Sequence, residues 1–211
     1  MATFNSTITG SNTGDTLIGT AAFQLIQAGT GNDSIASTFG NSSLYGNDGN
    51  DTFFANAAAK GVGAGNTLTG ANGADSFDFN TYGLTSVQVY GNQDNDKFNV
   101  LGQVQASSLY GGQGDDSLRI ANQVSASEIQ GNSGADTIDI TGSVVSTNLN
   151  GGQGDDRFFI TGTVSGSTVT GGLGADSLAF KETLIASSVQ LNSPAGTGDG
   201  NDTFVASSIV E

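Results

Sequence analysis

Apolar residues recur along this chain in pairs whose two members are separated by one residue. This spacing is the signature of a β-strand, because alternate side chains of a strand point to the same face. A helix is disfavoured, since no segment carries a long apolar period of 3.6 residues and Gly, Asn, Ser and Thr are abundant. The clearest pairs recur about every 20 residues, and they are Phe77 and Phe79, Phe98 and Val100, Leu118 and Ile120, Ile138 and Ile140, Phe158 and Ile160, and Leu178 and Phe180.

Two further apolar positions follow each pair before the pattern starts again. The first set is Val104, Val124, Val144, Val164 and Leu184, and the second, five residues later, is Leu109, Ile129, Leu149, Val169 and Val189. We therefore expect each coil to contain a sharp turn, one strand, a second bend and a return strand. All apolar positions would then face the inside of a tube, with equivalent residues stacked, as in the column Leu118, Ile138, Phe158 and Leu178.

A Gly-x-x-Gly-x-Asp motif precedes the apolar pairs and repeats with them. Its glycines are clearest in four copies, at Gly111 and Gly114, Gly131 and Gly134, Gly151 and Gly154, and Gly171 and Gly174. Its aspartate occurs ten times, at Asp15, Asp33, Asp51, Asp75, Asp96, Asp116, Asp136, Asp156, Asp176 and Asp202. A repeat of this length predicts an all-β, right-handed parallel β-solenoid (a β-roll or β-helix) of about ten coils of ~20 residues.

The repeat also predicts how the chain is organised. Residues 1–14 are expected to form an N-terminal cap and the start of the first coil. Residues 15–205 should form a single solenoid domain, and residues 206–211 a C-terminal tail. Two less regular stretches, near 56–67 and 192–198, are expected to be insertions that form loops on one face.

Composition and charge exclude several classes of function. The 211 residues include no Cys and no His, which excludes disulfides, zinc–thiolate sites and histidine-based catalysis. A formal net charge of −15 disfavours nucleic acid and anionic membrane surfaces as partners. No membrane-spanning run and no cleavable N-terminal signal is seen, and we expect no catalytic residues.

The residue types of the motif suit calcium. Ca²⁺ prefers six to eight hard oxygen ligands, and stacked glycine turns bring backbone carbonyls close together because glycine accepts unusual dihedral angles. A column of aspartates without cations would repel itself strongly. About seven or eight ions would bring the chain near neutrality. The alternative is a metal-free ladder of Asx hydrogen bonds.

The motif resembles the calcium-binding nonapeptide repeats of the repeats-in-toxin (RTX) family, over about residues 10–205. The resemblance implies several Ca²⁺ ions between successive turns, held by the ten aspartates and by backbone carbonyls of the glycine-rich turns. The family pattern has two Gly-Asp turns in each coil, whereas the regular coils here have one. We therefore expect one column of ions, with no metal at the second bend near Gly102, Gly142 and Gly162.

Three functions compete at this level. The first is a calcium-binding structural protein, secreted or surface-exposed, that folds or becomes rigid on binding Ca²⁺. The second is an assembly subunit, such as a virion decoration or fibre protein or a surface-layer tile, whose partner is itself or a lattice. The third, ranked last, is a polysaccharide-cleaving enzyme. Tyr45, Tyr90 and Tyr110 each precede a glycine turn, and a packing row is favoured over a sugar-binding platform.

Overall fold

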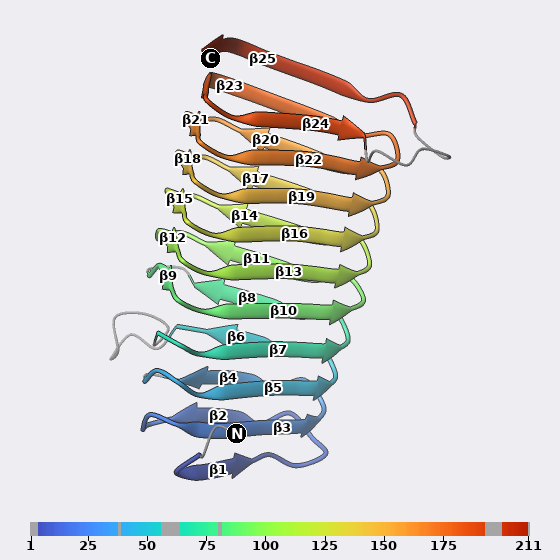
Figure 1. Ribbon diagram of the computed structural model, residues 1–211. Coiled ribbons are helices and arrows are strands. Elements are labelled where there is room, and N and C mark those ends of the chain that lie inside the picture. Colours follow the sequence, from blue (N-terminus) through green and yellow to red (C-terminus); the bar gives the residue numbers. More distant parts are fainter. Residues whose placement is uncertain (1–3, 38, 56–63, 80–81, 193–199, 211) are drawn as a thin grey trace.

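The computed structural model describes residues 4–37, 39–55, 64–79, 82–192 and 200–210, and it is a parallel β-solenoid. Strands of one sheet run along the front in Figure 1, and the chain returns behind them while it climbs from the amino to the carboxyl end, so the coil is right-handed. The predicted fold class is therefore confirmed. Among the described residues there is no helix of the length and hydropathy needed to cross a membrane.

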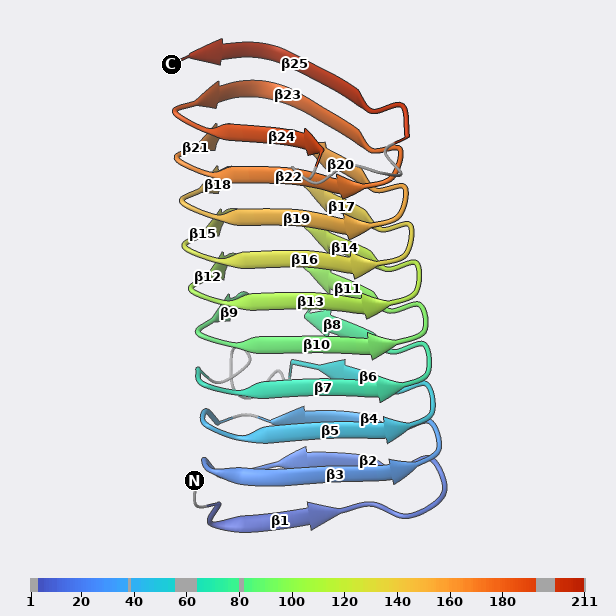
Figure 2. The same cartoon turned by 45° about the vertical axis from the view of Figure 1, so that its right-hand side comes forward.

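The first sheet has ten strands in parallel register and forms the flat front of the molecule in Figure 2. These are the strands that end at the Gly-Asp turns. Their bounds are β1 (Ser6–Thr9), β3 (Gln24–Thr30), β5 (Ser43–Asp48), β7 (Thr67–Asn72), β10 (Gln88–Gln93), β13 (Ser108–Gln113), β16 (Glu128–Ser133), β19 (Asn148–Gln153), β22 (Thr168–Leu173) and β24 (Ser188–Asn192).

The second sheet contains the strands that follow the turns. They are β2 (Thr16–Gly19), β4 (Ser34–Ser37), β6 (Thr52–Phe54), β8 (Ser76–Phe79), β11 (Lys97–Val100), β14 (Ser117–Ile120), β17 (Thr137–Ile140), β20 (Arg157–Ile160), β23 (Ser177–Ile185) and β25 (Thr203–Val210). A third row of two-residue strands joins this sheet through β23: β9 (Leu84–Thr85), β12 (Val104–Gln105), β15 (Val124–Ser125), β18 (Val144–Val145) and β21 (Val164–Ser165).

The third row of strands refines the predicted coil. We expected two strands per coil, but the regular coils contain three, because two further residues at the second bend pair with their equivalents in the next coil. The first coils, whose aspartates are 18 residues apart, show no such strand in the part of the chain that is described. The 20-residue repeat thus has two residues more than the 18-residue coils, and it contains an additional two-residue strand.

The core is a continuous column inside the tube. All the apolar positions predicted to face inward are at most 3% exposed, except Val189, which is half-buried at the last strand of the first sheet. The predicted column from Leu118 to Leu178 is in direct register. Below it the rings of Phe53, Phe77 and Phe98 stack with centroids 4.8 and 4.7 Å apart.

Both ends of the described solenoid consist of strands. β1 pairs with β3 from residue 6 onward, and β25 pairs with β23 as far as Val210, past the predicted domain end at residue 205. Most of the two predicted insertions, residues 56–63 and 193–198, lies outside the described residues.

Candidate metal-binding corner

The Gly-Asp motif forms the sharp corner between the first and second sheets. In a regular coil the corner comprises residues 114–116, between β13 and β14. Gly114 has a φ of 119° and Gly112 one of 130°, in the left-handed region that glycine adopts without steric cost. Asp94, which replaces the second motif glycine, is also left-handed, with a φ of 70°. The turn thus requires a left-handed backbone, which glycine adopts without strain and which Asp94 also adopts.

All ten predicted aspartates lie in one column along this corner. The Oδ1 atom of each aspartate from the second onward accepts a hydrogen bond from the backbone amide of the aspartate one coil earlier, and the nine links measure 2.7–3.0 Å. The eight aspartates from Asp33 to Asp176 are at most 2% exposed. We call this column the aspartate ladder.

The second carboxylate oxygen has a different environment. The Oδ2 atoms of seven ladder residues are buried and accept no hydrogen bond: Asp33, Asp51, Asp75, Asp96, Asp116, Asp136 and Asp156. A buried polar atom without a partner costs free energy, and a buried charge costs more. The ladder therefore links the coils but leaves one oxygen of each of these carboxylates uncompensated.

The first motif glycine lies directly against this oxygen. A Cβ atom added to Gly151 would lie 2.2 Å from Asp156 Oδ2 and 2.5 Å from the carbonyl oxygen of Gly171 in the next coil. Gly111 has the same surroundings, with Asp116 Oδ2 at 2.1 Å and the Gly131 carbonyl oxygen at 2.7 Å. The absence of a side chain thus brings a carboxylate oxygen and a carbonyl oxygen of neighbouring coils together.

The eight predicted glycines divide into two roles. Gly111, Gly131, Gly151 and Gly171 are the residues that lie against an Oδ2 atom. The other four, Gly114, Gly134, Gly154 and Gly174, have positive φ angles. The backbone amides of Gly114, Gly134 and Gly154 donate hydrogen bonds to carbonyl oxygens in the next coil. The acceptors are Ser133, Gln153 and Leu173. Calcium coordination by any of these residues remains a prediction.

Burial raises the pKa values of the central carboxyls well above 3.8, because the charged form loses its hydration. The pKa rises to about 6 for Asp51 and Asp116, to about 7 for Asp75 and Asp156, and to about 8 for Asp96 and Asp136. The hydrogen bond to each Oδ1 acts in the opposite direction and is smaller, and neighbouring carboxylates add to the rise. Without a cation these groups would bind protons near neutral pH.

Asp15, at the first coil, behaves differently. Its Oδ2 accepts hydrogen bonds from the amide and hydroxyl of Ser11, at 2.6 and 2.8 Å. The backbone bond, followed by the hydroxyl bond, holds the pKa of this carboxyl below its usual value. The end of the ladder is thus satisfied by local hydrogen bonds, whereas the middle is not.

The acids next to the ladder have a structural role that we did not predict. Asp115 and Asp155 are exposed and accept hydrogen bonds at 2.8 Å from the amides of Ala135 and Ala175 in the next coil. Asn32, Asn50 and Asn95 make the same contact. A second, exposed row of Asx contacts therefore lies beside the buried ladder, interrupted at Ala74, Ala135 and Ala175, whose side chains cannot accept.

A ladder of neutral side chains at the opposite corner also escaped the sequence reasoning. Each hydroxyl oxygen in it accepts a hydrogen bond from the backbone amide of the equivalent residue one coil earlier, at 3.1–3.4 Å. From Ser107 onward, Ser or Thr recurring every 20 residues was the signal that could have revealed it. We call it the hydroxyl ladder, and its members are Ser42, Ser107, Ser127, Thr147, Ser167 and Ser187.

The oxygen atoms of the aspartate corner are suitable ligands for a hard cation. Its inward atoms are carboxylate and carbonyl oxygens, which Ca²⁺ prefers. Among the described residues no group of three or more acidic, His or Cys side chains could hold a metal by itself. With one buried aspartate per turn, backbone carbonyls would have to provide most of the ligands of a cation bound here, and the buried Oδ2 atoms without hydrogen bonds would provide its negative charge.

Two segments of the chain, residues 25–58 and 99–119, match the RTX calcium-binding nonapeptide repeat in four copies. They include the turns of Asp33, Asp51 and Asp116. A search of curated proteins found no match to the chain. Solenoids of RTX repeats are typically non-catalytic, and proteins that carry such repeats are typically secreted. Residues 25–58 and 99–119 are thus similar to the RTX calcium-binding nonapeptide repeat, and they form part of a parallel β-solenoid.

Proposed function

We propose that this protein is a non-enzymatic, calcium-binding structural protein, extracellular or surface-exposed, that folds or becomes rigid when Ca²⁺ binds along the aspartate ladder. The observation that carries the proposal is the row of buried Oδ2 atoms without partners, one per coil from Asp33 to Asp156. A fold that buries so many carboxylates needs either protons or a compensating cation. RTX repeats are the kind of motif that provides one as Ca²⁺.

The ligands would come from neighbouring coils. Asp156 and the Gly171 carbonyl are one such set, and Asp116 and the Gly131 carbonyl are another. A bound ion would supply positive charge to the carboxylates and a link between coils that hydrogen bonds alone do not provide. Because unfolded chains lack this arrangement, the binding free energy would appear as folding stability.

The proposed location follows from the same coupling. Free calcium is scarce inside cells and abundant outside them, so a chain that needs Ca²⁺ would fold after export. The strongly acidic composition, with a net charge of −15, would favour the unfolded chain wherever calcium is low. Both points support an extracellular or surface-exposed protein.

An assembly subunit is the second candidate. Val205, Ile209 and Val210 on β25, the last strand, are 51–63% exposed, which is unusual for apolar residues grouped on one strand. Another copy of the chain, or a surface or capsid lattice, would cover them. Light scattering after size-exclusion chromatography in calcium separates the two: a single-chain mass favours the structural monomer, and a larger mass favours assembly.

The test of calcium binding compares melting curves in excess CaCl₂, in MgCl₂ and in chelator, followed by circular dichroism. Each occupied site is expected to add about 3 kcal/mol when free Ca²⁺ exceeds its Kd 100-fold, so the melting temperature should rise strongly with calcium and little with magnesium. Identical melting curves in calcium and in chelator would contradict the proposal and favour a metal-free ladder of Asx hydrogen bonds.

A matched pair of double variants assigns the effect to the ladder. Asp116→Asn with Asp156→Asn keeps the side-chain shape and the Oδ1 acceptor but removes two buried charges. Asp115→Asn with Asp155→Asn removes the same charge one residue away, where the carboxylates are exposed. We expect the first pair to lower the number of bound ions, measured by calorimetry, and the second to preserve it. Equal losses in both pairs would contradict the assignment.

A further inference from the structure

The outer face of the first sheet carries few charges, unlike the aspartate corner beside it. Three rows of outward residues cross the strands from β5 to β22, and Glu128 is the only charged residue in them. Asp48, at the end of β5, is also exposed and lies beside these rows. The other members are amides, hydroxyls, tyrosines, glycines and one alanine. On a chain with a net charge of −15, this face would neither repel nor attract ions strongly.

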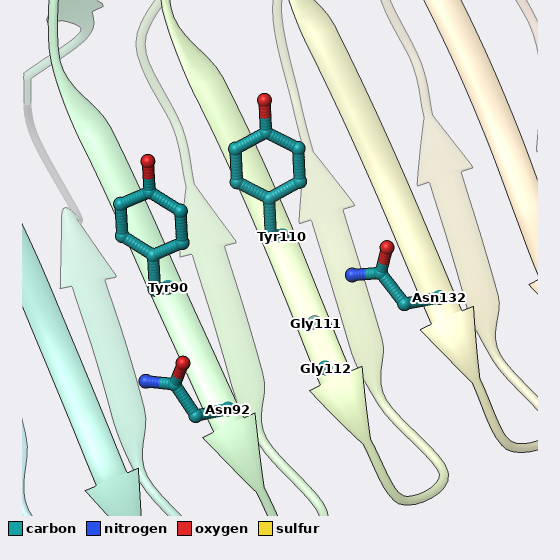
Figure 3. A pocket seen from close by; sticks show the side chains of 6 residues that line it. All are labelled: Tyr90, Asn92, Tyr110, Gly111, Gly112 and Asn132. Carbon is teal, nitrogen blue, oxygen red and sulfur yellow. The ribbon is translucent and has the colours of Figure 1, made fainter.

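Two tyrosines form the aromatic part of this face. Tyr90 on β10 and Tyr110 on β13 are in register, with ring centroids 5.1 Å apart and an angle of 14° between the ring planes. Figure 3 shows the two rings side by side on neighbouring strands, with their hydroxyls at the same end. Tyr45, the third tyrosine of the row, lies apart, because its register neighbours are Gln27 and Thr69. The predicted tyrosine row is thus a pair on the surface.

A hollow of about 360 Å³ adjoins the pair. It forms because Gly112 has no side chain, whereas Asn92 and Asn132, at the equivalent positions of the coils on either side, extend their amides outward (Figure 3). These asparagines have φ angles of 84° and 82°, values that Asn adopts more readily than most residues. Two amides therefore flank an open space beside two aromatic rings.

Hydrogen bonds hold one side of the hollow in place. The Tyr110 hydroxyl donates to Glu128 Oε2 at 2.7 Å, and the other Glu128 oxygen accepts from the Gln130 side chain. The Glu128 carboxylate is thus engaged with its neighbours. A fixed ring loses little conformational entropy when a ligand packs against it.

We propose that this face binds a neutral oligosaccharide of hexopyranose units, which pack on Tyr90 and Tyr110 and form hydrogen bonds with Asn92 and Asn132. The C–H faces of a sugar ring pack on aromatic rings, and its hydroxyls pair with amides, which both donate and accept. Successive strands advance by about 4.8 Å, close to the length of one sugar unit in an extended polymer. An uncharged ligand fits a face with almost no charge.

The proposal does not depend on the role of calcium, and it is tested on protein saturated with Ca²⁺. Cellohexaose, maltohexaose and mannohexaose serve as probes in calorimetric titrations. We expect at least one to bind, and Tyr90→Ala with Tyr110→Ala to weaken that binding at least tenfold. Tyr45→Ala, which removes a tyrosine from the same row outside the hollow, is the matched control and should have no effect.

A second variant keeps the test independent of aromatic packing. Asn92→Gly with Asn132→Gly removes the two amides and places at both positions the residue that the coil between them carries, which adopts positive φ angles without strain, so the fold should be retained. It should also weaken binding at least tenfold. The proposal is wrong if none of the three hexasaccharides binds, if binding survives both changes, or if Tyr45→Ala weakens it equally.

Discussion

The two corners of the solenoid use the same hydrogen-bond geometry with different chemistry. At the aspartate corner, each backbone amide donates to a carboxylate one coil later, as Asp116 does to Asp136 at 2.8 Å. At the opposite corner, each amide donates to a hydroxyl one coil later, as Ser107 does to Ser127 at 3.2 Å. The central members of both ladders are buried, and both ladders run along the tube. The comparison separates the effect of the ladder from the effect of its charge.

The hydroxyl ladder satisfies itself and the aspartate ladder does not. Ser127 accepts one hydrogen bond and donates another, at 2.7 Å, to the carbonyl oxygen of Ser125. A carboxylate can only accept, and the second oxygen of Asp136 is buried with no donor. A neutral corner is therefore complete as folded, whereas a charged one needs a proton or a cation. We therefore expect the stability contributed by the aspartate corner to depend on pH and on calcium, and that of the hydroxyl corner to depend on neither.

The largest effect that we expect from the difference between the two corners is a change in the melting temperature of the calcium-free protein with pH. Six ladder carboxyls have folded pKa values of about 6 to 8 against an ordinary value of 3.8. The folded state therefore binds more protons than the unfolded state between these values, and stability falls as pH rises from about 4 to 8. We expect the melting temperature in chelator to be at least about 10 °C higher at pH 5 than at pH 8.

Saturating calcium is the control for this measurement. Ca²⁺ would compensate the carboxylates without protons, so the melting temperature should no longer rise toward pH 5, where protons compete with the metal. A calcium-free protein that melts at the same temperature at both pH values would show that the ladder carboxylates are not costly to bury.

Ser127→Ala probes the neutral corner and should have a smaller effect. It removes the acceptor for the Ser107 amide and leaves that buried amide unpaired, at a cost of about 1–2 kcal/mol. Because no charge is involved, the loss of melting temperature should be the same in calcium and in chelator. A loss that appears only in calcium would mean that the hydroxyl corner also takes part in metal binding.

The smallest effect is expected from Ala126→Gly at the same corner. Ala126 has a φ of 49°, in the left-handed region, which costs most residues energy. Two coils later the equivalent residue is Gly166, with a φ of 56°. We expect a gain of about 0.5–1 kcal/mol, independent of calcium. An unchanged or lower melting temperature would indicate that the Ala126 methyl group contributes packing that offsets its backbone strain.

The sequence predicted the strands and the ladder column because both depend on spacing. Alternating pairs such as Leu118 and Ile120 have one face to bury, and a repeat of 20 residues places each above its equivalent. The ten aspartates follow the same repeat, so they had to stack wherever the coils stacked. No knowledge of side-chain conformation was needed for either prediction.

Other features could not be predicted in this way. The two-residue strand at Val124 depends on backbone pairing that side-chain pattern does not specify. The contact of Asp115 with Ala135 and the hydroxyl ladder depend on which polar side chain turns toward the next coil, and Ser, Thr, Asn and Asp can all do so. The sequence likewise placed Tyr90 and Tyr110 in a row without showing that the row lies outside the tube.

By itself, the sequence determined the repeat, the stacking order and the identity of the residues at each corner, because a periodic apolar pattern has few ways to exclude water. Tertiary structure alone decided that one carboxylate oxygen of each central coil is buried without a donor and lies against a glycine. That arrangement depends on the direction of a side chain between two coils. Only the folded tube brings the aspartate of one coil and the carbonyl oxygen of the next to the same point.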